Sequence, residues 1–467
     1  MNVLLVNPRT PDGCGKSYYL PLGLLYLASA GEKAGCNCQL LDFNTYIPYT
    51  KENPDGYCKQ ILEEKILQFQ PDVILLGCLF SGQFQQVVDL SIVIKRISPN
   101  ITTVLGGIHA TSYPSEILSN CNDIDFIVIG EGEETLQQLL CKLINGESKF
   151  QYLDGLAFRD EAGEIVINPK TKFIENLDEI AFPAYHLVTM KDYHIDTSTW
   201  HNPKSLDILA SVPIITSRGC PMKCNFCPMS SVMGKHYRHR SVDNIFAELD
   251  LLYSKYGHTY FSFMDDNLTL NKKFTMDLCN KIIGSDMNIQ IDTTNGVSVS
   301  SLDEEVIDAL VRAGLVRVAL AIESGSAAIR ERMGKKLSRE KIIAVVNTLK
   351  KYPSVYIRGF FILGMPEDTN ETLNETYELI KEIDIDSNEV CNLIPFPGTK
   401  LFDQAVSDNL FIDNVYRNDL WKSTYILSQR DYFVLKPYNM SIEEMKHWRE
   451  MFDVVEKKPI CYDRITA

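Results

Sequence analysis

The sequence predicts an α/β protein with a doubly wound, Rossmann-like N-terminal domain, a partial (β/α)6 barrel and a small C-terminal cap. Three observations predict it. Short apolar segments alternate with amphipathic ones over residues 1–150, and a second such series runs over residues 206–400. Nearly continuous apolar strands are typical of parallel sheets that helices cover. Three cysteines, Cys220, Cys224 and Cys227, follow the first strand of the second series.

The first domain is expected to contain five strand–helix units. The expected strands are 2–7, 38–43, 73–78, 102–105 and 124–129; the expected helices include 22–33 and 57–69, one that ends at 97 and one that ends at 144. A loop with Gly13 and Gly15 follows the first strand. Doubly wound sheets bind their ligands at the carboxyl ends of the strands.

Glycine and polar residues gather at those strand ends. The candidate binding residues are Asn7, Gly82, Gly106, Gly107, His109, Glu131 and Gly132. Glycine lets the backbone approach a ligand closely, although a glycine in each turn could also serve only the tight β–α connections. Neither a G-x-G-x-x-G dinucleotide motif after the first strand nor a phosphate-loop motif occurs.

A connector with a hairpin is expected over residues 151–205, because two short apolar segments flank the turn sequence at 160–163. The second series then predicts the partial barrel. Its expected strands are 212–217, 260–265, 289–294, 316–322, 355–363 and 389–394, with helices such as 242–256, 302–313 and 339–352. Residues 401–467 are expected to form a cap, and the sequence assigns them no chemistry.

The three cysteines have the spacing C-x3-C-x2-C, which indicates an iron–sulfur cluster. Three thiolates cannot complete the usual four-cysteine ligation, so one iron would stay open to a small molecule. A zinc site completed by His236 or His239 is an alternative. Disulfides are not expected, because the thirteen cysteines are scattered and no signal peptide opens the chain.

Further polar residues lie at the predicted barrel mouth, the carboxyl ends of the barrel strands, where barrel proteins have their active sites. They are Asp265, Asn295, Glu323, Ser324 and Arg358. An aspartate at a strand end is commonly only the cap of the next helix. Glu323 is harder to dismiss, because a carboxylate directly after an apolar strand is costly unless it is paired or binds a ligand.

Composition narrows the function classes. The hydrophobic content of 45% and charged content of 23% are ordinary for a globular protein. No apolar run is long enough for a membrane span. The formal charge of −15 argues against nucleic-acid binding, which needs a basic face. The many free cysteines predict a reducing, cytoplasmic location.

Several of these motifs together resemble those of a known protein family. The three-cysteine loop with Phe226, the six β–α units and the segment 323–326 are similar to the radical S-adenosylmethionine (SAM) superfamily. The N-terminal domain resembles the cobalamin-binding domain of one branch of that superfamily. The residues that carry this second likeness are Asn7-Pro8, Pro21–Gly23, Gly106–Ala110 and Gly130–Glu133.

The resemblance implies that Cys220, Cys224 and Cys227 bind three irons of a [4Fe–4S] cluster and that SAM chelates the fourth. Reductive cleavage of SAM would give a 5′-deoxyadenosyl radical, and methylcobalamin would deliver a methyl group. The residues of the barrel mouth and Phe226 would bind SAM; those of the first domain would bind cobalamin. The D-x-H-x-x-G motif is absent, so His109 is expected to be a loop residue and not a cobalt ligand.

The resemblance therefore predicts a cobalamin-dependent C-methyltransferase that acts on a small molecule and takes electrons from a flavodoxin or ferredoxin. Oxidative cyclisation or rearrangement on the same cofactors is one alternative. A methylthiotransferase is another, but Cys14, Cys36 and Cys38 lack the spacing of its second cluster. A cobalamin or metal sensor without enzymatic activity is the third.

Overall fold

The computed structural model describes residues 1–9, 19–46, 53–79, 81–193, 203–206, 211–412, 420–422 and 432–456. The expected glycines Gly13 and Gly15, and Cys14, lie outside these ranges. The chain divides into two compact units, of which the first holds residues 1–193 and the second holds most of the remainder. None of the described helices has both the length and the apolar character needed to cross a bilayer.

The first unit is built on a seven-stranded sheet of order β2-β1-β3-β4-β5-β6-β7. Strands β1 to β5 are parallel, whereas β6 and β7 are antiparallel additions at one edge. The strands are β1 Asn2–Asn7, β2 Asn37–Asp42, β3 Val73–Gly77, β4 Thr102–Gly106, β5 Phe126–Val128, β6 Leu156–Arg159 and β7 Ile165–Ile167. The predicted doubly wound sheet is confirmed.

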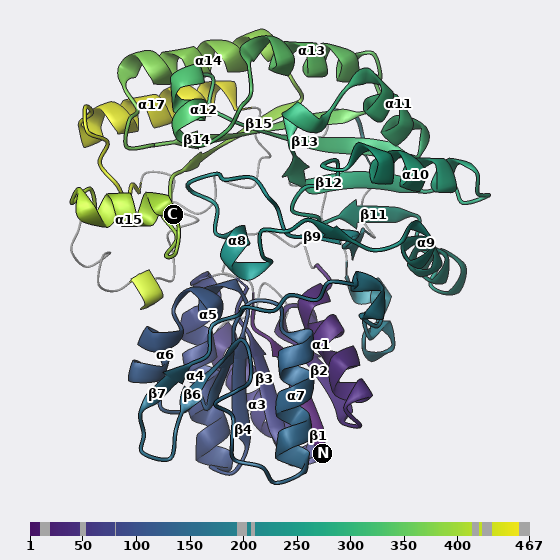
Figure 1. Cartoon of the computed structure of the whole chain (residues 1–467), viewed down its shortest axis with the longest axis vertical. Helices are drawn as coiled ribbons and strands as arrows, with labels where there is room; N and C mark the ends of the chain where they lie inside the picture. The colour runs from purple at the N-terminus through teal and green to yellow at the C-terminus, as the bar shows by residue number, and fades with distance from the viewer. Residues whose placement is uncertain are drawn as a thin grey trace. The chain divides into compact units, whose positions relative to one another are not determined.

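Helices cover both faces of this sheet (Figure 1). Their bounds are α1 Leu22–Lys33, α2 Phe43–Tyr46, α3 Pro54–Phe69, α4 Phe84–Ile97, α5 Ile108–Ser112, α6 Pro114–Asn120 and α7 Glu133–Ile144. On one face, Leu24 of α1 and Leu136 of α7 pack with Val3 and Leu75 in one buried cluster. The strands are buried on both faces, which explains why they are apolar without alternation.

The second unit contains a parallel six-stranded sheet of order β15-β14-β13-β12-β11-β8. The predicted partial (β/α)6 barrel is therefore confirmed, and β8 and β15 are its two edges. The strands are β8 Val212–Ile214, β11 Tyr260–Phe263, β12 Gln290–Val297, β13 Leu315–Glu323, β14 Tyr356–Leu363 and β15 Ser387–Asn392. Two short strands, β9 Ser217–Arg218 and β10 Arg238–His239, pair separately.

Helices follow these strands, and α9 to α14 and α17 lie on one face of the sheet, whereas α8 and α15 do not (Figure 1). The helices are α8 Met229–Val232, α9 Val242–Asp250, α10 Lys272–Ile283, α11 Glu304–Arg312, α12 Ala327–Arg332, α13 Arg339–Lys350, α14 Asn370–Ile383, α15 Lys400–Ser407 and α17 Ile442–Val455. The helix expected over 242–256 is α-helical only to Asp250 and continues as a π-helical turn over Leu251–Lys255.

Of the connector expected at 151–205, residues 151–193 belong to the first unit, and the described residues 203–205 belong to the second. The hairpin of the connector forms β6 and β7, and β6 pairs with β5. Residues 420–422 from the expected cap also cluster with the first unit. There, the ring of Trp421 lies 6.0 Å from that of Phe84. The domain boundaries read from the sequence remain a prediction.

Candidate active site

The three-cysteine loop directly follows β9, at the carboxyl end of the first barrel strand. Cys220, Cys224 and Cys227 are all partly exposed, and none forms a disulfide. Burial by the surrounding loop raises the pKa of all three thiols, that of Cys227 to about 11. The thiols are therefore protonated near neutral pH, and iron must displace a proton from each on binding.

Two adjacent carboxylates hold the backbone that enters this loop. The Oδ1 of buried Asp265 accepts hydrogen bonds from the N–H of Thr216 (3.2 Å) and the hydroxyls of Thr216 (2.6 Å) and Ser217. Asp266 Oδ2 accepts from the N–H of Gly219 at 3.0 Å. The pair follows β11, so the second barrel strand fixes the residues that lead into Cys220. That Asp265 also binds a cofactor remains a prediction.

The far side of the loop is held by α12 and α15. The N–H of Asn225 donates to the Met333 carbonyl, and the Asn225 carbonyl accepts from Leu401 N–H, both at 3.0 Å. Gly334 has a φ of +82°, and a Cβ on it would lie 2.6 Å from the Lys223 carbonyl oxygen. Phe226 packs against the apolar cluster that contains Met333 and Leu401. The loop is thus fixed at both ends.

Glu323 is paired in the structure. Lys335 Nζ donates to Glu323 Oε1 at 2.7 Å and to the Ala321 carbonyl at 2.9 Å. Glu323 ends β13 with a φ of +70°, which is unfavourable for a residue with a side chain and is often found at functional sites. Lys335 also interacts electrostatically with Cys220 and Cys224. The sequence analysis missed Lys335, since only the fold places it beside the cysteines.

The remaining predicted mouth residues occupy different positions. Asn295 is exposed near the end of β12 and donates to the Met264 carbonyl at 2.9 Å. Ser324 is buried, and its hydroxyl accepts from Ser326 N–H at 3.1 Å. Arg358 is the third residue of β14 and pairs with Glu389 on β15. Asp265, Asn295 and Glu323 therefore lie at strand ends, whereas Arg358 lies near the start of its strand.

The zinc alternative is not supported by the geometry. Among the described residues, no three His, Cys, Asp or Glu side chains come together to hold a metal ion. The ring of His239 stacks on Phe274 at 4.2 Å, and its Nδ1 donates to the Arg240 carbonyl. A cluster with several irons spaces its thiolates more widely than one ion does, and the partly exposed three-cysteine loop fits such a group.

The predicted ligand edge of the first unit is formed by the ends of its parallel strands. Asn7 ends β1 and donates to Asp42 Oδ1 at 3.0 Å, while Tyr193 donates to Asp42 Oδ2 at 3.0 Å. Gly107 has a φ of +111°, and a Cβ on it would lie 2.4 Å from the Cys78 carbonyl oxygen. A Cβ added at Gly106 would have its nearest neighbour, the Val128 carbonyl oxygen, at 3.9 Å. The turn thus requires glycine at position 107, whereas position 106 has room for a side-chain Cβ.

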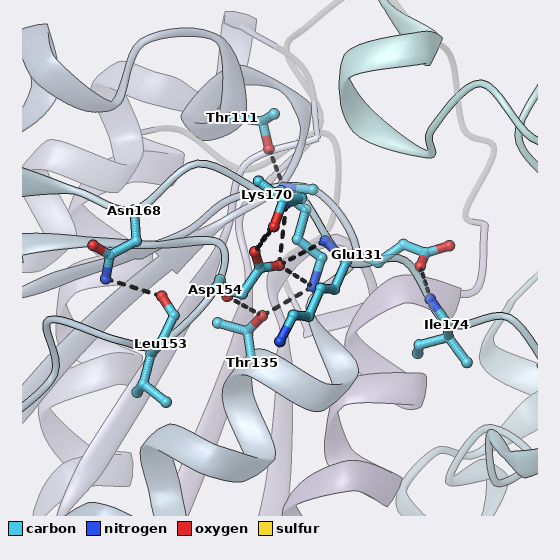
Figure 2. Close-up of polar contacts among 11 residues, drawn as sticks. Thr111, Glu131, Thr135, Leu153, Asp154, Asn168, Lys170 and Ile174 are labelled. Carbon is cyan, nitrogen blue, oxygen red and sulfur yellow. Dashed lines mark hydrogen bonds and ion pairs between the residues drawn. The ribbon is translucent and has the colours of Figure 1, made fainter.

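A polar network supports the loop from Gly130 to Gly132 (Figure 2). Glu131 is buried and accepts from the N–H of Ile174 at 3.0 Å. Lys170, whose side chain is 3% exposed, donates to the Thr135 hydroxyl at 3.1 Å and lies 3.8 Å from Asp154. Lys170 comes from the connector, which the sequence analysis left without a role. A buried lysine needs such partners, and here they join the hairpin to the loop.

His109 is a buried aromatic residue of this edge. Its Nδ1 lies 2.9 Å from the Ser81 hydroxyl, and its ring lies 4.6 Å from that of Phe84 and 5.1 Å from that of Tyr113. Burial lowers the pKa of His109 from 6.5 to about 4. Gly82 lies next to Ser81 in a 3-10 turn over Ser81–Gln83. His109 is therefore neutral and packed within the protein.

This burial makes stability depend on pH. Below about pH 6.5 the unfolded chain binds a proton at His109 that the folded chain does not, so stability is lost as pH falls. We expect His109 to account for a loss of about 2 kcal/mol between about pH 7.5 and pH 5. The measurement is urea unfolding at both pH values. His109→Gln should flatten this slope; an equal slope in the variant and the wild type would contradict the prediction.

Comparisons with known proteins agree with this geometry. Residues 214–380 match the family model of the radical SAM superfamily, and residues 11–140 match that of the B12-binding domain. The uncharacterized methyltransferase PH0819 of Pyrococcus horikoshii is 31% identical over 89% of this chain and 86% of its own. Cytidylyl-2-hydroxyethylphosphonate methyltransferase of Streptomyces wedmorensis is 27% identical over 91% and 84%.

A solved structure has the same fold over nearly the whole chain. It is the radical SAM methyltransferase TsrM from Kitasatospora setae with cobalamin and a [4Fe–4S] cluster bound. The TM-score is 0.70 at 18% identity, and the match covers 97% of this chain and 85% of that one. The two units and the three-cysteine loop thus define an iron–sulfur enzyme with a second cofactor domain.

The chain belongs to the radical SAM superfamily, in the branch that carries an N-terminal cobalamin-binding domain. It is an enzyme whose cofactors are a [4Fe–4S] cluster, SAM and cobalamin. Cys220, Cys224 and Cys227 would hold the cluster, and when bound it supplies the electron that cleaves SAM. The individual contacts proposed for SAM and cobalamin remain predictions.

Proposed function

We propose that the enzyme transfers a methyl group from SAM to a carbon atom of a small-molecule substrate, with cobalamin as the methyl carrier. The observation that supports this most is the pairing, in one chain, of the three-cysteine barrel with the cobalamin-type domain. The two relatives described above are named as methyltransferases, whereas two others that match 86% of this chain are named as anaerobic magnesium-protoporphyrin IX monomethyl ester cyclases. In the proposed balance, one SAM supplies the methyl group and leaves as S-adenosylhomocysteine. A second SAM takes one electron and the hydrogen atom of the substrate C–H bond and gives methionine and 5′-deoxyadenosine, and a second electron would restore the methyl carrier.

The residues of this chain would contribute position and exclusion of water. The contacts of Asp265, Asp266 and Met333 hold the loop residues next to the three cysteines. Electrons would come from a small redox protein such as a flavodoxin or ferredoxin. We propose that the enzyme works in the cytoplasm, since each described cysteine is free and a reducing compartment keeps it so.

The methylthiotransferase alternative is not favoured by the described cysteines. Cys36 and Cys38 are both buried, and Cys38 Sγ packs against Gly31 in the apolar core of the first unit. Burial raises the pKa of both thiols, that of Cys38 to about 12. Buried neutral thiols of this kind are small apolar residues, and ligation of a second cluster would need thiolates that solvent and iron can reach.

The test is methyl transfer with labelled SAM. The full chain, reconstituted without oxygen with iron, sulfide and cobalamin, is incubated with methyl-¹³C SAM, reductant and a low-molecular-weight extract of the source cells. We expect ¹³C in a small molecule together with 5′-deoxyadenosine, and neither in Cys224→Ala. Formation of 5′-deoxyadenosine with a product that carries no label would refute methyl transfer and favour cyclisation or rearrangement.

A further inference from the structure

Strand β15 is an edge strand whose open side is bound by side chains of the C-terminal helix. Among the described strands it pairs only with β14, so one row of its backbone groups has no strand partner there. The N–H of Val390 donates to Glu456 Oε1 at 2.6 Å, and the Val390 carbonyl accepts from Arg449 Nη1. Both backbone groups of one residue are therefore satisfied by a charged pair from α17 and the residue after it.

This charged pair is deeply buried. Arg449 is 2% exposed and Glu456 is 3% exposed, and Arg449 Nη2 lies 2.6 Å from Glu456 Oε1. Asp453 adds a contact to Arg449 at 3.0 Å. Burial of two charges costs more than an apolar contact unless they are paired and hydrogen-bonded. An apolar pair could attach α17 equally well, but it could not bind the backbone of β15.

The docking of α17 is set independently by apolar packing and by α14. Met445, Trp448 and Phe452 are buried, and the Trp448 indole donates to Asn370 Oδ1 at 2.8 Å. Figure 1 shows α17 beside α14 in the second unit. Since these contacts already attach the helix, the contacts of Arg449 and Glu456 with Val390 serve to position strand β15.

The residues on either side of Val390 face away from the helix-covered side of the sheet. Side chains alternate along a strand, so Glu389 and Cys391 share the opposite face. Glu389 is 32% exposed and pairs with Arg358, whose guanidinium lies 4.9 Å from the ring centre of Phe360. Cys391 as a residue is exposed, but burial of its thiol, followed by the charge of Glu389, raises the thiol pKa to about 12. This is the inner face of the barrel.

We propose that Arg449 and Glu456 are positioning residues that fix β15, so that Glu389 and Cys391 present a constant wall to the substrate. The strand's role as a substrate wall rests on the proposed function, whereas its fixation by the pair does not. The C-terminal segment would thus have a role: its side chains bind the open edge of β15, where a neighbouring strand would otherwise pair.

The test compares two substitutions that remove the same charge. Glu456→Gln keeps an oxygen that accepts from Val390 N–H, and Glu456→Leu does not. In the reconstituted full chain, amide exchange in β15 and alkylation of Cys391 by iodoacetamide are followed by mass spectrometry. We expect the leucine variant to raise both rates on the order of tenfold. The glutamine variant should stay near wild type, because Asp453 remains paired with Arg449. Glu450→Gln, exposed on the same helix, is the control.

The possible outcomes test separately whether the pair fixes β15 and whether β15 positions the substrate. Equal rates in the leucine variant and wild type would overturn the fixation of β15, and so would equal increases in both Glu456 variants. In the methyl-transfer assay, the leucine variant should form more 5′-deoxyadenosine per labelled product, because a shifted wall misplaces the substrate. An unchanged ratio with increased exchange would refute the positioning role. Absence of label in the wild type would reject methyl transfer and leave the exchange result standing.

Discussion

Replacement of Cys224 by alanine will abolish both the iron–sulfur absorbance and the cleavage of SAM. Cys224 lies in the middle of the three-cysteine loop, and Asn225 beside it is hydrogen-bonded to α12 and α15. No other residue of the loop can supply the lost thiolate. We expect reductive cleavage to fall by at least about a thousandfold, measured as 5′-deoxyadenosine after anaerobic reconstitution.

The control for this experiment is Cys141→Ala. Cys141 is an exposed cysteine on α7 of the first unit, so its loss removes a reactive thiol without touching the loop. It should retain iron, absorbance and activity. Cleavage of SAM at an undiminished rate by the Cys224 variant would contradict the cluster assignment.

Replacement of Lys335 by methionine should lower both stability and SAM affinity. The side chains of Lys335 and Glu323 are 12% and 11% exposed, so the substitution leaves a buried carboxylate without its cation. Loss of one partner of such a pair costs about 3 kcal/mol in the free energy of unfolding. Lys335 also binds the Ala321 carbonyl and thereby helps to hold Glu323 at its positive φ.

We expect SAM to bind about tenfold more weakly to this variant, because the end of β13 would relax from its strained conformation. Urea unfolding measures the first effect, and equilibrium dialysis of SAM measures the second. Lys336→Met is the matched control, since the neighbouring lysine is exposed. A variant that loses stability but binds SAM as the wild type does would show that Lys335 is only structural.

Much of the fold could be predicted because most strands are largely apolar and buried on at least one face. Segments such as Val73–Gly77 and Leu315–Glu323 stand out in a sequence, and each was expected within two residues of its bounds. The hairpin of β6 and β7 was also expected, but its pairing with β5 was not. A turn predicts which two strands pair with each other; it contains no information on a third strand more than twenty residues away.

The residues of the candidate site likewise fall into those that the local sequence predicts and those that only the fold reveals. Cys220, Cys224 and Cys227 are close in sequence, and a short loop can bring their thiols together, so their spacing, together with their place after the first barrel strand, indicated the cluster ahead of a zinc site. Lys170, Lys335, Arg449 and Glu456 act across elements that only folding brings together. Nothing in their local sequence distinguishes them from surface charges.

The sequence by itself determined the class of fold, the cluster motif and the two cofactor domains. The class of fold and the cluster motif follow from hydrophobic periodicity and from spacings of a few residues, which are local properties of the chain. The two cofactor domains were implied by the resemblance of these motifs to a known family. The tertiary structure decided which charges are buried and what they hold: Lys335 against Glu323, and Arg449 with Glu456 against the edge of β15. Burial and long-range contact arise only when distant segments pack, because the cost of an unpaired buried charge then selects its partner.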